Sequence, residues 1–178
     1  MVIVPLLWFI GTYNALVRLR QHVAESWSGI DTELKRRYNL IPNLVATVRG
    51  YAAHERGVLE EVIRARRQAV ASTGSAASQA RDENQLVHAL RHLFAVVENY
   101  PQLKASEHFL RLQQELVNTE DRIQAARRFY NANVRDLNNR VEMFPSSLVA
   151  AMFSFQQADF FEVENCDIRR APQVSIAR

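Results

Sequence analysis

Apolar residues recur in alternating steps of three and four along most of this 178-residue chain. The pattern covers residues 13–41, 41–69, 86–100 and 109–144. Such spacing lines one face of an α-helix, and no useful length of β-type alternation accompanies it. The five glycines and five prolines are too few for a many-turned β fold. We therefore predict an all-α chain, folded as an up-and-down antiparallel four-helix bundle with an N-terminal apolar anchor segment.

Pro42 stands between the first two helical patterns. It has no N–H, and its ring would clash with the carbonyl of Tyr38 in a continuing helix. It also biases Ile41 away from helical geometry, whereas a proline suits the first turn of a new helix capped by Asn39. We therefore predict a corner here, with two helices folding back antiparallel and Trp27 lying near the second. A kink in one long helix is the alternative.

Polar residues and the other prolines set the remaining helix boundaries. The second helix is predicted to end near Ala71, before a serine-rich loop. The third is predicted to begin within residues 80–85 and to end at Pro101. The fourth is predicted to end at Pro145, and a short helix follows over residues 147–153.

The N-terminus is strongly apolar, with no charged side chain in residues 1–17. A membrane-spanning helix needs about 20 apolar residues and at least about 17. The segment fits a transmembrane anchor shortened by a late start codon, an interfacial anchor, or a cleaved signal peptide. The last lacks a basic leading region and a small-residue cleavage pattern. We divide the chain into an anchor over residues 1–12, a helical bundle over 13–163 and a disordered tail over 164–178.

Aromatic residues crowd the region after the short helix. Phe153, Phe155, Phe160 and Phe161 are together too apolar to be left in water. We expect this segment to fold back onto the helices, with Phe155, Phe160 and Phe161 mostly buried.

Charged residues interrupt the apolar stripes. Arg20, Glu55 and Arg66 occupy positions where core residues are expected, and Glu120 lies beside a fourth such stripe. An unpaired buried charge is costly, so these groups are predicted to pair across helices or to extend to solvent. They form either a structural network that fixes the helix register or a polar groove that binds a ligand.

A basic run covers Lys35, Arg36 and Arg37. A charge run of this kind is typical of a solvated helix face. Glu33 stands four residues before Arg37, which predicts an ion pair on the outer face of the helix.

Motifs for catalysis and metal binding are absent from the sequence. No Glu is followed by His three residues later, His54 and Glu55 do not continue into a zinc-protease motif, and no Gly-rich phosphate loop occurs. A net charge of +3 makes no nucleic-acid footprint. We predict no enzyme, no cofactor and no nucleic-acid partner. A ligand- or metal-binding domain that uses His54 and Glu55, or His88 and His92, is the alternative.

One continuous motif covers residues 35–45, which read KRRYNLIPNLV, and residues 49–55 follow as RGYAAHE. Shorter motifs stand at residues 13–17, 27–31, 65–66, 98–105, 130–131 and 144–146. In this order, over residues 13–162, they resemble the LemA family. The resemblance implies a bacterial, membrane-anchored helical bundle, with a membrane helix that runs directly into residues 13–17. It therefore favours the shortened anchor.

Together, the motifs and the interrupted stripes nominate a set of structural or interaction positions. These are Arg20, Arg36, Arg37, Pro42, Asn43, His54, Glu55, Arg66, Tyr130, Asn131, Phe144 and Pro145. We predict a non-enzymatic interaction or scaffold module, attached by a single pass to the bacterial inner membrane. Because Arg18 and Arg20 follow the apolar segment, the helical domain is expected in the cytoplasm. The expected partner is an unknown protein, and the resemblance points to membrane protein quality-control components.

Overall fold

The computed structural model describes residues 3–164, and within this range it contains six α-helices and no strand. The helices are α1 (Ile3–Tyr51), α2 (Arg56–Ala71), α3 (Ala76–Val97), α4 (Pro101–Lys104), α5 (Glu107–Glu142) and α6 (Ser146–Met152). The predicted all-α class is confirmed.

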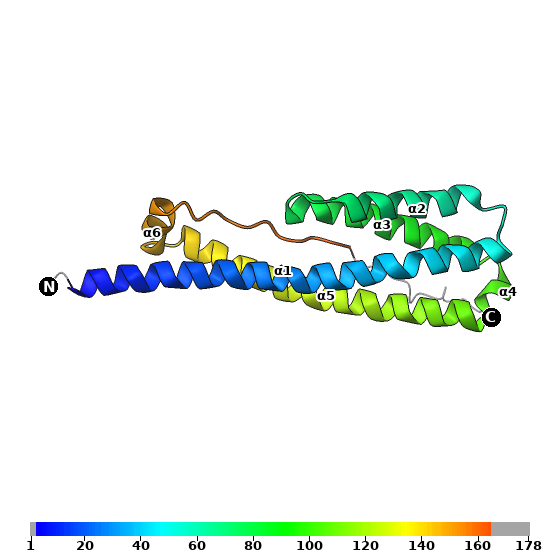
Figure 1. Cartoon of the computed structure of the whole chain (residues 1–178), viewed down its shortest axis with the longest axis horizontal. Helices are drawn as coiled ribbons and strands as arrows, with labels where there is room; N and C mark the ends of the chain where they lie inside the picture. The colour runs from blue at the N-terminus through cyan, green and yellow to red at the C-terminus, as the bar shows by residue number, and fades with distance from the viewer. Residues whose placement is uncertain (1–2, 165–178) are drawn as a thin grey trace, which may run out of the picture.

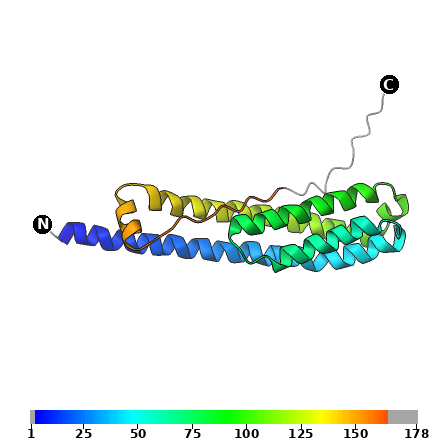
Figure 2. The ribbon, with the colours of Figure 1, turned by 90° about the horizontal axis from the view of Figure 1, so that it is seen from above.

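Helices α1 and α5 form an antiparallel pair along most of the molecule (Figure 1). A second pair, α2 and α3, covers only the half of α1 that lies farthest from its N-terminus (Figures 1 and 2). At the opposite half, α6 folds against α1 and α5. Residues 155–164 then run back along the helices without regular structure, and we call them the strap. The first part of the strap thus occupies a region that α2 and α3 are too short to reach, whereas its end lies against α3, where Asn84 bonds to Glu162 and Glu164.

Two groups of buried apolar side chains hold these elements together. The larger lies where α1, α2, α3 and α5 meet, and Ile41, Val62, Leu90 and Ile123 are fully buried within it. The smaller, near α6, consists of Leu16, Leu137, Val149, Ala150 and Phe155. Burial of each such side chain contributes about 1.5–3 kcal/mol, so the strap and α6 are part of the folded domain.

The predicted corner at Pro42 is wrong, because α1 continues through it to Tyr51. The buried face explains why. Ile41, Leu44 and Val45 on either side of the proline are all in the core, and a continuing helix keeps them on one face. This burial outweighs the cost of about 3 kcal/mol for a proline in a helix interior.

A side chain from α2 compensates for part of the proline's cost. Pro42 cannot donate to the carbonyl of Tyr38, one turn earlier. The Nε of Arg66 donates a hydrogen bond to that carbonyl oxygen at 2.7 Å. A charged donor from another helix therefore replaces the missing backbone N–H.

The chain reverses direction ten residues later than predicted, at residues 52–55. Trp27 was predicted to lie near the second helix. Its ring instead makes edge contacts with Tyr130 at 5.2 Å and Phe161 at 5.3 Å between centroids. These contacts tie α1 to α5 and to the strap.

Several other boundaries were predicted closely. α2 ends at Ala71 as expected, and α5 ends at Glu142, shortly before Pro145. Helix α3 begins at Ala76, earlier than the predicted range, because the hydroxyl of Ser75 accepts the N–H of Ser78 and caps it. It also ends before Pro101, which instead starts α4.

The aromatic segment folds back as expected, though not every ring is buried. Phe155 and Phe161 are buried, whereas Phe160 retains 38% of its surface and Phe153 is also exposed. The predicted burial of Phe160 is therefore wrong, because neighbouring residues of an extended segment point to opposite sides. Residues 165–178 of the predicted tail lie outside the described residues.

Candidate functional site

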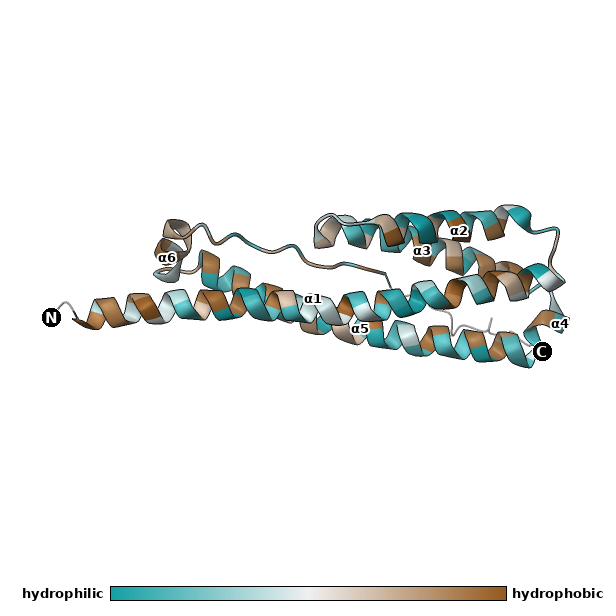
Figure 3. Cartoon of the chain, in the orientation of Figure 1, coloured by the Kyte–Doolittle hydropathy of each residue, from teal (hydrophilic) through white to brown (hydrophobic). Residues whose placement is uncertain are grey.

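The N-terminal end of α1 is apolar and uncovered. Exposed apolar side chains there are Ile3, Val4, Leu6, Leu7, Trp8 and Ile10. Figure 3 shows this end as a hydrophobic extension beyond the rest of the fold. We call residues 3–10 the apolar end. Within residues 3–164, no helix carries an apolar stretch long enough to span a membrane.

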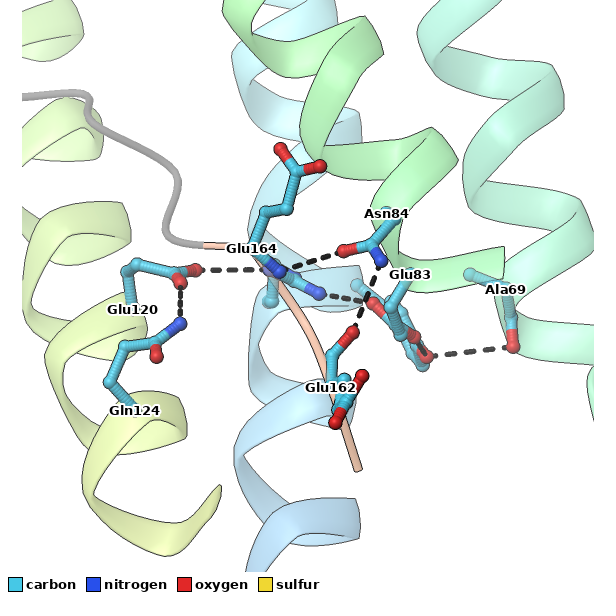
Figure 4. A network of polar contacts seen from close by, with 9 residues as sticks. Ala69, Glu83, Asn84, Glu120, Gln124, Glu162 and Glu164 are labelled. Atoms are coloured by element: carbon cyan, nitrogen blue, oxygen red, sulfur yellow. Dashed lines mark hydrogen bonds and ion pairs between the residues drawn. The ribbon is translucent and has the colours of Figure 1, made fainter. Parts of the chain in front are cut away.

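A buried ion cluster lies in the half of the molecule where α1, α2, α3 and α5 meet. Arg37 of α1 is 1% exposed, and its guanidinium donates to Glu83 on α3 and, at 3.0 Å, to Glu120 on α5. Both carboxylates are also buried. Figure 4 shows Glu83 and Glu120 approaching from opposite sides of α1. One guanidinium thus bridges two helices that flank its own.

Further side chains complete the hydrogen bonding of the two carboxylates. Tyr38 donates its hydroxyl to Glu83, and the Nε2 of Gln124 donates to Glu120 at 2.7 Å. Burial of the phenol and the nearby Glu83 carboxylate raise the pKa of Tyr38 far above its usual value of 10.0. The phenol therefore stays protonated and acts as a donor.

The polar network continues into α2. The carbonyl of Tyr38 accepts the hydrogen bond from Arg66, while its hydroxyl bonds to Glu83. Tyr38 therefore links α2 and α3 through its two oxygens, and Arg37 adds α5. Because shifting α1, α3 or α5 would leave a buried charge unpaired, the network favours a single register for these three helices.

The model of the LemA family matches residues 26–176. This range contains the ion cluster, the turn at residues 52–55 and the strap. The chain belongs to the LemA family.

Named relatives extend this result. The chain is 25% identical to the magnetosome protein MamQ of Magnetospirillum gryphiswaldense and 26% identical to MamQ 2 of Paramagnetospirillum magneticum. Each match covers 84% of this chain but only 64% of the relative's length. Protein LemA of Metamycoplasma hominis is 25% identical over 90% of the chain and 74% of its own length. None of these three relatives is named as an enzyme.

The continuous motif at residues 35–45 contains an error of the sequence prediction, the placement of Arg37. Arg37 was expected on the outer face beside Glu33, but it is the centre of the buried cluster. Glu33 instead lies 3.8 Å from Arg122 of α5. Arg37 follows Leu34 by three residues and precedes Ile41 by four, so it fits the apolar stripe as well as Tyr38 does.

Glu83 was missed entirely. It lies three residues after Ala80 and three before Leu86, on the buried face of α3. A carboxylate at a core position of one helix and Arg37 at a core position of another would have suggested the pair. The predicted apolar stripe of this helix began at Leu86 and was not extended back to Glu83.

The other stripe charges find partners of three kinds. The guanidinium of Arg20 lies 5.0 Å from the ring centroid of Phe155, a cation–π contact. Glu55 accepts the hydroxyl of Tyr100 at 2.9 Å, and this bond raises the pKa of Tyr100. Arg66 bonds to a backbone carbonyl, as described above. Glu120 is thus paired across helices as predicted, and Glu55 and Arg66 each have a hydrogen-bond partner, whereas the contact of Arg20 is an aromatic ring.

Asparagine side chains of α5 hold the strap by hydrogen bonds to its backbone. The side-chain amide of Asn131 donates to the carbonyl of Phe161 at 3.1 Å and accepts its N–H at 2.9 Å. Asn138, two turns later, makes the same pair of bonds to Ala158. Tyr130 adds a hydrogen bond to the carbonyl of Asp159 at 3.0 Å. These side chains give the strap the backbone partners that a neighbouring strand would otherwise provide.

The remaining nominated residues lie at the surface. Arg36, Pro42, Asn43 and His54 are exposed, as are Phe144 and Pro145. The structure does not bring them into one site. Phe144 and Pro145 come directly before α6, and Figure 1 shows α6 near the end of the fold opposite to the turn between α1 and α2 that contains His54.

The two histidines of α3 have separate acidic neighbours. His88 Nε2 lies 3.8 Å from Glu164, and His92 Nδ1 lies 3.0 Å from Glu61. Residues 3–164 contain no group of three or more side chains arranged to hold a metal ion.

A shallow groove of about 750 Å³ runs beside the end of the strap. Arg127, Arg128 and Arg135 of α5 line it, together with Glu162 and Glu164. Arg127 donates to the carbonyl of Val163 at 2.7 Å and so belongs to the strap's own fixation. The groove carries both basic and acidic side chains, and this mixed charge matches no single class of ligand.

Proposed function

We propose that this LemA-family chain is a membrane-anchored, non-enzymatic interaction or scaffold module. Its apolar end inserts into the bacterial inner membrane as part of a single-pass attachment, and the remaining helices project into the cytoplasm as an up-and-down bundle. The single observation that carries this proposal is the exposed apolar surface on every side of the first turns of α1.

Helical geometry explains why this end favours lipid. Successive residues are rotated by about 100°, so the exposed side chains of Ile3, Val4, Leu6, Leu7 and Trp8 are spread around the helix axis. A helix that is apolar all round is typical of a protein core or a membrane. No other element of residues 3–164 covers these side chains, so lipid is the environment that fits them.

The charges near this end support a cytoplasmic domain. The first charged side chains are those of Arg18 and Arg20, and the first acidic residue is Glu25. Cations that flank an apolar segment remain on the cytoplasmic side of bacterial membranes. They also favour contact with anionic lipid headgroups.

The internal use of the ion cluster supports a structural role over a catalytic one. Arg37, Glu83 and Glu120 bond to one another and to neighbouring side chains. The proposed partner is a protein, and membrane protein quality-control components remain the class that the family resemblance suggests. A pull-down from native membranes with the apolar end intact would name it.

Vesicle flotation tests the anchor directly. The full chain is expected to float with vesicles made of phosphatidylethanolamine and phosphatidylglycerol. Val4→Asp with Leu7→Asp removes two exposed apolar side chains whose transfer into lipid would contribute about 1.5–3 kcal/mol each, so binding should weaken by about 100-fold or more. The matched control is Leu110→Asp with Phe129→Asp, which alters two exposed apolar residues of α5 and should float normally.

Circular dichroism checks that both variants keep the wild-type melting temperature. A wild-type chain that stays with the soluble fraction as a monodisperse monomer would overturn the anchor. Equal loss of flotation in both variants would show that general surface hydrophobicity, and not the apolar end, drives binding.

A further inference from the structure

Two uncharged segments, distant in sequence, meet beside the apolar end. The first is residues 3–17 of α1, and the second is residues 143–158. The second segment contains the loop after α5, all of α6 and the start of the strap. In a chain with 41 charged residues, counted as 22 basic and 19 acidic, two such stretches at one end are a distinct surface.

Aromatic contacts fix the two segments at the same level along the molecule. The ring centroid of Phe153, which follows α6, lies 5.9 Å from that of Phe9 and 4.7 Å from that of Tyr13. Phe9 is six residues from the start of α1, which is about 9 Å along the helix. Any surface that takes up the first turns of α1 therefore comes close to α6.

The outer face of α6 is apolar and uncovered. Val149 and Ala150 are buried against the helices, whereas Leu148 and Met152, which share the opposite face, are 62% and 69% exposed. In the preceding loop, Met143 and Phe144 are 62% and 79% exposed. Large apolar side chains are rarely grouped in this way on a surface that faces only water.

We propose that α6 and the loop before it form a second lipid-binding surface, which lies in the headgroup region of the membrane that takes the apolar end. We call residues 143–153 the foot. This inference rests on the proposed membrane anchor and adds a defined contact to it. The foot fits the interface because short amphipathic segments bury their apolar face about 5–10 Å into the headgroup boundary.

Continuity with the anchor favours lipid over a second copy of the chain. The exposed side chains of the apolar end surround α1, and a partner chain would cover only one side of it. Arg18 and Arg20 stand just beyond the first uncharged segment, whereas Glu142 and Asp159 bound the second, with Arg140 two residues before Glu142. Cations at this level match an anionic headgroup layer.

Environment-sensitive fluorescence tests the foot in the full chain. A Cys166→Ser background carries single substitutions Leu7→Cys, Leu148→Cys or Phe129→Cys, each labelled with the NBD fluorophore. Vesicles contain equal parts of phosphatidylethanolamine and phosphatidylglycerol. The labels at positions 7 and 148 should both shift to shorter wavelength and brighten on adding vesicles. The label at position 129, an exposed apolar site on the middle of α5, should not change.

The outcomes separate the two proposals. A response at position 7 without one at position 148 overturns the foot and leaves the anchor intact. No response at either position overturns both. A blue shift at position 148 in the absence of vesicles assigns this face to self-association and overturns the foot as a lipid contact.

Binding measurements give an independent readout. Leu148→Asp with Met152→Asp should weaken vesicle partition by about tenfold or more while leaving the melting temperature unchanged, because both side chains are exposed in the free protein. Phe129→Asp with Leu110→Asp is the matched control and should bind like the wild type. Equal affinity of the foot variant and the control would overturn the proposal.

Discussion

At the scale of single residues, Arg37 is the side chain that most constrains how the helices align. It meets two carboxylates in the protein interior, and each of those carboxylates bonds to one further side chain. Such a cluster is weak as a source of stability but costly to break from one side. Its effect is therefore greatest on which helix alignment the chain accepts.

Replacing Arg37 alone should reveal this cost. Arg37→Met leaves Glu83 and Glu120 buried without their cation, and the free energy of unfolding should fall by about 3–5 kcal/mol. Arg36→Met, on the exposed neighbouring residue, should change it by less than about 0.5 kcal/mol. Urea denaturation measures both. A triple variant with Met at all three cluster positions should lose less than Arg37→Met does, and a larger loss would contradict the unpaired-charge explanation.

Tyr38 predicts a specific response to alkali. Its pKa is raised in the fold by burial and by Glu83, whereas the unfolded phenol ionises near 10.0. The stabilising contribution of the protonated phenol is thus fully present below pH 10 and is lost as the pH rises beyond it. In Tyr38→Phe, the free energy of unfolding should fall less steeply between about pH 9 and 11 than in the wild type. Identical slopes in urea titrations would contradict this role.

At the scale of elements, α1 shows how one side chain allows a helix to pass through a proline. The carbonyl of Tyr38 loses its backbone partner at Pro42 and bonds to Arg66 of α2 instead. The continuity of α1 and the position of α2 are therefore coupled.

A double-mutant cycle measures that coupling. Arg66→Met leaves the Tyr38 carbonyl without its donor and should destabilise by about 1–3 kcal/mol. In a Pro42→Ala background a backbone N–H is restored at position 42, so the same substitution should cost less than about 1 kcal/mol. Additive effects of the two substitutions would show that Arg66 does not compensate for the proline.

The strap offers a matched pair of neighbouring aromatics. Phe161 is fully buried and touches Trp27, whereas Phe160 is partly exposed. Phe161→Ala should lower the free energy of unfolding by about 3–5 kcal/mol, and Phe160→Ala by clearly less. Thermal denaturation compares the two, and equal losses would mean that the strap does not pack as described.

Periodicity predicted the existence and class of the long helices, because a buried stripe repeats over many residues. It placed the ends of α2 and α5 well, since polar or proline-containing sequence follows each. It failed at Pro42, where local backbone preference competes with continuous burial of Ile41, Leu44 and Val45. It also failed at Arg37, because a charge is read as exposed unless its buried partners on other helices are known.

At the scale of the whole molecule, the helices are unequal in length. α1 has 49 residues and α5 has 36, whereas α2 and α3 have 16 and 22. The strap and α6 fill the difference, and three asparagines, Asn84, Asn131 and Asn138, bond to the strap's backbone. The sequence predicted that the aromatic segment returns to the helices. It did not predict the asparagine hydrogen bonds that hold this segment, because they join residues far apart in the chain.

With the proposed anchor in the bilayer, the length of α1 sets the distance between the membrane and the turn at residues 52–55. From Thr12 to Tyr51 the helix climbs up to about 60 Å, while electrostatic attraction from the headgroups fades within about 8 Å at physiological salt. A partner that binds the turn must therefore be soluble or extend far from the membrane. The electrostatic potential of the lipid headgroups would not affect that binding. A partner that binds beside α6 would lie close to the membrane surface. Proteins that project only slightly from the membrane could therefore bind there.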